Sequence, residues 1–207
     1  MSSVNTNLIK LNAGVASIAT DDAWQIVRLP VIETEVKKQA GKVVLFKLTG
    51  AETATAEQIA GTEIPAGKVV VPFVVWQARR EALAARVAAG EVGVWLETHE
   101  LVEDLAAQAD VNAFPVIAIH VERFADGRIY SAGALLRSRF GFKNELRAFG
   151  DVLRDQLFFF KRCGFDAYQI RADRSAEDAL PSLNDFSDPY QGATVIDQPV
   201  WRRHARV

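Results

Sequence analysis

Acidic, basic and hydroxyl side chains gather in two short stretches of the chain. The first contains Glu122, Arg123, Asp126, Arg128, Tyr130 and Ser131, and the second contains Asp151, Arg154 and Asp155. Arginines near a helix N-terminus bind anions, because free backbone N–H groups point outward there. We therefore expect a site for a small anionic ligand, in which arginines hold the anion and carboxylates orient them or transfer protons.

The candidate residues divide into two roles. The catalytic candidates are Asp126, Tyr130 and Asp151, which would handle protons or donate a hydrogen bond. The anion-binding candidates are Arg128, Ser131, Arg137, Arg147 and Arg154. Arg147 is unusual because it lies inside a short strand that we expect to be covered on both faces. A charge there needs a partner such as Asp126 or Asp151.

Each candidate also has a purely structural interpretation. Asp126 and Gly127 together are typical of a turn, and Ser131 and Asp151 are typical helix caps. In the same interpretation, Arg147 belongs to a buried ion pair. The sequence leaves both interpretations open.

The other reactive side chains give weaker signals. Cys163 is the one cysteine of the chain and lies near an expected helix C-terminus, where a thiol is more often packed than reactive. His99, His120 and His204 have no second ligand at a spacing typical of a metal site, and we expect His120 in the core or lining a pocket. The chain lacks a nucleophile elbow, a P-loop and a dinucleotide fingerprint, so the sequence indicates no cofactor.

Alternating strands and helices would position these side chains. Residues 1–66 form a β-rich N-terminal part, with an insertion at 33–63, residues 67–171 an α/β core, and residues 172–207 an irregular tail. The expected strands are 7–11, 24–29, 42–48, 68–75, 92–96, 115–121, 145–149 and 167–170, and the expected helices are 77–89, 98–109, 131–140 and 151–161.

This alternation predicts an α/β fold with a mainly parallel sheet, built either as an open three-layer sheet or as a partial barrel. We expect one domain over residues 1–207. Ligands of parallel sheets bind at the carboxyl ends of the strands. The two candidate stretches follow the strands at 115–121 and 145–149, so we expect them at that edge.

Composition excludes several classes of protein. The net charge of −2 gives no basic field for nucleic acid, and the basic segment 201–206 is interpreted as a solvated end. Apolar runs such as 69–76 are far shorter than the roughly 20 residues of a membrane helix. The N-terminus lacks the basic and apolar regions of a signal peptide, so we expect a cytoplasmic protein with no membrane or nucleic-acid partner.

Several linked motifs resemble a known bacterial family. They are residues 67–76 (GKVVVPFVVW), 93–96 (GVWL), 124–137 (FADGRIYSAGALLR), 141–157 (GFKNELRAFGDVLRDQL), 162–168 (RCGFDAY) and 185–191 (DFSDPYQ). Together they are similar to the domain-of-unknown-function family 934, over about residues 64–204. The resemblance implies an oxidoreductase of sulfite reduction, a label that rests on gene neighbourhood and brings no catalytic residues. Residues 33–63 depart from the family pattern.

Three hypotheses follow. The first is an accessory protein of assimilatory sulfite reduction that binds an anionic intermediate or sulfite reductase itself. A single cysteine cannot supply the four ligands of an iron–sulfur cluster, so the chain cannot be the catalytic reductase by itself. The second is a cofactor-independent isomerase or lyase on a barrel-like scaffold, and the third is a non-catalytic docking subunit of sulfite reductase. A homo-oligomer is compatible with all three.

Overall fold

The computed structural model describes residues 7–30 and 54–203. Its strands are β1 (Leu8–Asn12), β2 (Val15–Ile18), β3 (Gln25–Ile26), β4 (Val69–Pro72), β5 (Val92–Glu97), β6 (Val116–Val121), β7 (Glu145–Gly150) and β8 (Ala167–Gln169). Its α-helices are α1 (Ala56–Gly61), α2 (Phe73–Ala78), α3 (Arg80–Ala88), α4 (Val102–Gln108), α5 (Arg128–Ser138), α6 (Leu157–Arg162), α7 (Ala176–Ala179) and α8 (Val200–Arg203). Three 3₁₀ turns are η1 (Val111–Ala113), η2 (Arg154–Gln156) and η3 (Leu180–Asn184).

The strands form one sheet in the order β2-β1-β8-β7-β6-β5-β4-β3. Strands β3 to β8 run parallel, and the β1–β2 hairpin adds to the β8 edge in the antiparallel sense. The sheet curls into a half-barrel. The expected α/β fold with a mainly parallel sheet is confirmed, and of the two architectures left open the protein adopts the partial barrel.

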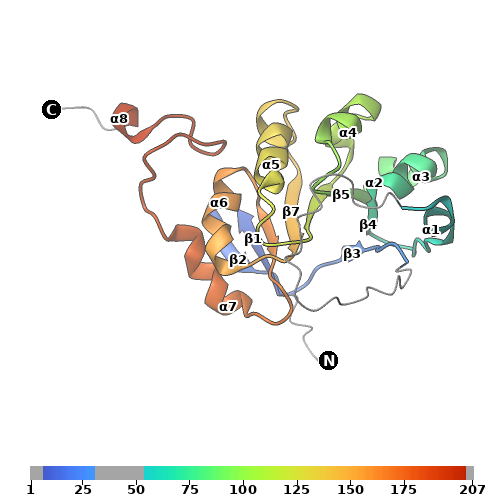
Figure 1. Cartoon of the computed structure of the whole chain (residues 1–207), viewed down its shortest axis with the longest axis horizontal. Helices are drawn as coiled ribbons and strands as arrows, with labels where there is room; N and C mark the ends of the chain where they lie inside the picture. Colours follow the sequence, from blue (N-terminus) through green and yellow to red (C-terminus); the bar gives the residue numbers. More distant parts are fainter. Residues whose placement is uncertain (1–6, 31–53, 204–207) are drawn as a thin grey trace, which may run out of the picture.

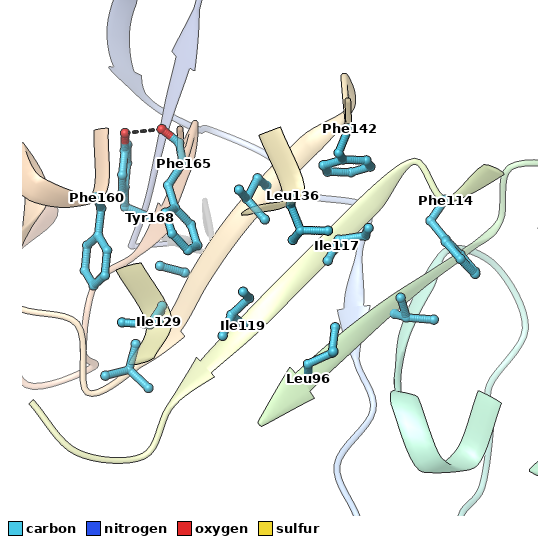
Figure 2. Close-up of a cluster of buried hydrophobic side chains, with 14 of the residues drawn as sticks. Leu96, Phe114, Ile117, Ile119, Ile129, Leu136, Phe142, Phe160, Phe165 and Tyr168 are labelled. Carbon is cyan, nitrogen blue, oxygen red and sulfur yellow. Dashed lines mark hydrogen bonds between the residues drawn. The ribbon is translucent and has the colours of Figure 1, made fainter. Parts of the chain in front are cut away.

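The helices cover the convex face of this sheet (Figure 1). Sequential strand order with right-handed crossovers puts every connecting helix on the same side. Figure 2 shows the resulting core, in which Leu96, Ile117 and Ile119 of the strands meet Leu136 of α5 and Phe160 of α6. The Tyr168 hydroxyl donates a hydrogen bond to the Phe165 carbonyl at 2.6 Å (Figure 2), which satisfies a polar atom inside this core.

The concave face is covered by the N-terminal segment instead. Trp24 and Ile26 pack on Val70, Trp95 and Phe149, in a cluster separate from the helix-side core. The Trp95 indole N–H donates to the Val27 carbonyl at 2.7 Å. Because successive side chains of a strand point to opposite faces, both faces of β4 to β7 are apolar, and these strands have the continuous apolar runs seen in the sequence.

The boundaries within residues 68–89 differ from the sequence prediction. The strand expected at 68–75 ends at Pro72, and Phe73–Ala78 is helical because Phe73, Val75 and Trp76 bury their side chains from that helix. The helix expected at 77–89 is divided between α2 and α3 at Arg79, whose guanidinium donates to the carbonyls of Ile59 and Ala60. The strand expected at 42–48 lies outside the described residues.

The predicted caps Ser131 and Asp151 are wrong, and the helix expected at 98–109 starts later than predicted. Thr98 does not begin α4, which starts at Val102, because its hydroxyl donates to Asp126 instead. Gly127 precedes α5, and Ser131 lies within the first turn of that helix. Asp151 accepts hydrogen bonds from other loops, and the next helical turn is η2. Polar side chains expected to satisfy local backbone groups therefore make longer-range contacts.

The C-terminal tail contains α7, η3 and α8 within an otherwise irregular path, and its last part leads away from the sheet (Figure 1). Over residues 7–30 and 54–203, no helix has the length and apolar character needed to cross a membrane.

Candidate functional site

A cavity of about 680 Å³ opens at the carboxyl ends of β3 to β6. Its walls combine Trp95 and Phe73 with the carboxylates of Glu97 and Glu100. Glu97 is the last residue of β5, and Glu100 follows in the turn before α4. This is the edge at which parallel sheets bind ligands, so the cavity is the candidate site.

Glu97 pairs with His120 across neighbouring strands. The His120 Nδ1 lies 3.0 and 2.9 Å from the two Glu97 carboxylate oxygens. Because β5 and β6 are parallel and Glu97 is in register with His120, both side chains point to the concave face. The imidazole stacks on Phe149 at 4.9 Å and meets the Trp95 ring edge-on at 5.8 Å, which fixes its orientation.

Glu100 lies in the same cavity in a different environment. One carboxylate oxygen accepts a hydrogen bond from the Glu97 backbone N–H at 2.7 Å. Burial raises the pKa of Glu100 from 4.5 to about 7, the Glu97 hydrogen bond opposes this, and the nearby Glu97 carboxylate adds to it. Glu100 can therefore hold a proton near neutral pH and also release it.

Two of the carboxyl groups in the cavity thus have different environments. Glu97 is oriented by His120, and Glu100 is kept largely out of water. A pair of titratable groups whose environments differ in this way suits general acid–base catalysis. Within residues 7–30 and 54–203, no three His, Cys, Asp or Glu side chains are grouped so as to hold a metal ion.

The first predicted loop lies beside this cavity, at the carboxyl end of β6. Asp126 accepts hydrogen bonds from Thr98 and from Arg128, whose Nε is 2.9 Å away. The Arg128 hydrogen bond lowers the pKa of Asp126 to about 2. Asp126 and Arg128 therefore satisfy each other, and Asp126 stays ionised near neutral pH.

The second predicted loop contacts the first. Asp151 pairs with Arg171 at 2.6 Å and accepts a hydrogen bond from the Phe124 N–H at 2.9 Å. Arg154 lines a separate hollow of about 340 Å³ together with Arg174. The structure thus brings both loops to one edge of the sheet, where they contact each other. Arg154 does not join them and lines a different hollow.

The hydroxyl candidates lie on α5. Tyr130 is half-buried against Phe160, with ring centroids 5.1 Å apart, and burial raises its pKa. Ser131 is exposed. Tyr130 and Ser131 do not line the candidate cavity.

Arg137 lies at the opposite end of the sheet from the cavity. Its guanidinium donates to the carbonyls of Gly164, Phe142 and Asn144 at 2.7–2.9 Å and pairs with Asp166 at 2.6 Å. These partners surround the start of β7, so Arg137 ties loops together at the amino end of the strands.

Arg147 has other partners than those the sequence suggested. Its guanidinium binds Asp22 at 2.6 and 3.1 Å and Glu145 at 2.7 Å, and Lys10 binds Glu145 at 2.9 Å. The expected partners, Asp126 and Asp151, were wrong because they lie at the carboxyl edge. Arg147 points from the middle of β7 to the concave face. The buried ion-pair interpretation describes its contacts.

Sequence reasoning missed Glu97, Glu100 and His120 as a group. The sequence did contain a signal for them. Ligands bind at the carboxyl ends of parallel strands, and the same rule applied to the strand at 92–96 would have selected the residues that follow it. His120 was expected in the core or lining a pocket, and it lies beside the cavity as the partner of Glu97. Cys163 is half-buried at the end of α6, and burial raises its pKa.

Fold and site together define a half-barrel α/β protein with an acidic cavity at the carboxyl ends of its parallel strands. The chain belongs to a bacterial family described as proteins of unknown function (DUF934), whose sequence profile matches residues 93–201. The matched region includes Glu97, Glu100 and His120. Neither the curated proteins nor the solved structures contain a match to the chain.

Proposed function

We propose that this protein is an enzyme that moves protons on a small-molecule substrate bound in the cavity, in a reaction of the isomerase or lyase type. The observation that supports it best is the presence of Glu97 and Glu100 in one cavity, the first paired with His120 and the second with a pKa near 7. Such a pair can accept a proton at one substrate atom and deliver one at another.

The roles follow from the contacts. Glu97 is the base that takes a proton from a substrate carbon, and His120 orients its carboxylate. Glu100, protonated before the reaction, donates its proton to the oxygen or nitrogen that gains electron density. In an isomerisation the proton on Glu97 then returns to a second carbon, and Glu100 takes its proton back from the oxygen or nitrogen. In an elimination the protonated group leaves with the Glu100 proton, Glu97 releases its proton to solvent, and Glu100 takes one up from solvent.

The family resemblance suggests assimilatory sulfite reduction as the biological setting, and we propose that the reaction serves that process. The arginines expected to hold an anion argue against sulfite as the substrate. Arg128 is bound to Asp126, and Arg147 to Asp22 and Glu145. We therefore favour the second of the three hypotheses for the cavity itself.

The direct test is proton exchange with solvent. Purified protein is incubated in D₂O with a bacterial small-molecule extract, and ¹H NMR follows which C–H signals are lost. We expect at least one metabolite to exchange or convert, with a rate reduced about 100-fold or more in Glu97→Gln and Glu100→Gln. Glu81→Gln, on the exposed first turn of α3, is the control and should retain the wild-type rate. Exchange that both site variants retain in full would refute the proposal.

A second candidate function is docking to sulfite reductase. It is favoured by an exposed aromatic surface formed by α6 and the segment that follows η3. Phe159 and Phe186 are 53% and 64% exposed, and both contact the ring of Phe158, with ring centroids 6.4 and 5.0 Å apart. Exposed aromatic clusters are typical of protein interfaces. Calorimetry with purified sulfite reductase tests this, and binding that survives Phe159→Ser with Phe186→Ser would exclude this surface.

A further inference from the structure

We infer that the substrate of this cavity carries a positively charged nitrogen next to an apolar body. The inference deepens the proposed function, on which it rests, because it names the chemical class that the same cavity accepts. It follows from the charge of the lining, from the contacts of the neighbouring arginines and from the aromatic walls.

The charge of the lining is the first observation. Glu97, Glu100, Asp104 and Glu122 contribute carboxyl groups to the walls, and no lysine or arginine is among the described lining residues. Even with a proton on Glu100, the charge of the described lining residues is negative. A bound anion would meet like charges in a partly dehydrated space, which costs free energy, whereas a cation is attracted.

Neighbouring arginines neutralise only part of this charge. Arg123 Nε lies 4.0 Å from Glu122, and both side chains of that pair are exposed to solvent. Arg128 is bound to Asp126, and Arg171 is bound to Asp151 and Asp173. Glu103, the residue before Asp104, lies 3.7 Å from Arg139, while no ion pair of Asp104 occurs within residues 7–30 and 54–203. Asp104 is therefore available to bind an ammonium group of the substrate.

The walls favour an organic cation over a metal ion. Among the described residues, no cluster of three ligating side chains exists that would replace the hydration shell of a metal. Trp95, Phe73 and Leu101 instead offer apolar and aromatic surface beside the carboxylates. A ring face also attracts an ammonium group, so the walls bind both parts of such a substrate.

Three probes of similar size and different charge test the inference: phenethylamine, 2-phenylethanol and phenylacetate. Binding is followed by the ¹H–¹⁵N signal of the Trp95 indole, which lies in the cavity wall. We expect phenethylamine to bind about tenfold more tightly than the alcohol, because it gains a charged hydrogen bond, and phenylacetate to bind more weakly than either.

Two neighbouring substitutions supply the matched control. Asp104→Asn should bring the affinity for the amine close to that for the alcohol, while Glu103→Gln should leave it unchanged because Glu103 is directed to Arg139. The inference is wrong if the amine binds no better than the alcohol, if phenylacetate binds best, or if no probe shifts the Trp95 signal. None of these results affects the exchange experiment on Glu97 and Glu100, so a failed charge preference and a failed enzyme proposal are distinguishable.

Discussion

Replacing Arg147 with methionine should destabilise the protein far more than replacing any surface arginine. The Arg147 side chain is 0% exposed, and its partner Asp22 is 10% exposed. Methionine keeps much of the apolar volume but removes the hydrogen bonds to Asp22 and Glu145. Their carboxylates then remain close together, and Lys10 is the one other cation that pairs with them among the described residues.

The cost can be worked out from these contacts. Removing one partner of a buried ion pair costs about 3–5 kcal/mol, and the lower end applies here because Lys10 and some solvent remain. A loss of about 3 kcal/mol lowers the melting temperature of a protein of this size by about 6–12 °C. The second substitution Asp22→Asn, added to Arg147→Met, should recover part of the loss, because one uncompensated charge disappears.

Urea denaturation followed by circular dichroism measures the free energy of unfolding for each variant. The control is Arg128→Met, since Arg128 is 53% exposed in its pair with Asp126 and such pairs contribute about 0–1 kcal/mol. If the Arg147→Met protein is as stable as the Arg128→Met protein, the reasoning fails. The ion pairs of Arg147 with Asp22 and Glu145 would then not hold the N-terminal segment in place.

Three further outcomes are expected. Burial raises the pKa of Glu100 from 4.5 to about 7, so between these values the folded protein holds a proton that the unfolded chain releases. The free energy of unfolding of the wild type should therefore fall by on the order of 3 kcal/mol as the pH rises across that range. Urea titrations at pH 5 and pH 8 should show that Glu100→Gln loses this part of the pH dependence. Gly150→Ala should sharply reduce the rate of substrate C–H exchange with D₂O, because Gly150 has φ 103° and a Cβ there would lie 2.8 Å from the His120 ring. An unchanged rate together with an unchanged His120 NMR signal would contradict this. Gly133→Ala should cost about 1–3 kcal/mol, since its methyl group would overlap the buried Phe165 ring, and a melting temperature equal to that of the wild type would show that α5 can shift to accommodate it.

Local sequence patterns sufficed for the α/β architecture. The apolar runs at 92–96 and 115–121 are explained by strands covered on both faces, and the alternation with helices set the parallel direction. The parallel direction of the strands in turn places both predicted loops at the carboxyl edge of the sheet. Local patterns did not determine the element boundaries. The segment 73–78 is rich in β-branched and aromatic residues, yet it forms a helix that buries Trp76.

Tertiary structure alone decided which side chains meet. Arg147 pairs with Asp22, 125 residues away in the chain, because the sheet curls and the N-terminal segment crosses its concave face. Glu97 meets His120 through the register of β5 on β6, and Glu100 owes its raised pKa to burial. Propensity and periodicity are properties of neighbouring residues, whereas register, curvature and burial depend on the whole fold. The sequence therefore determined the edge that carries the site, and packing determined that the cavity there is acidic.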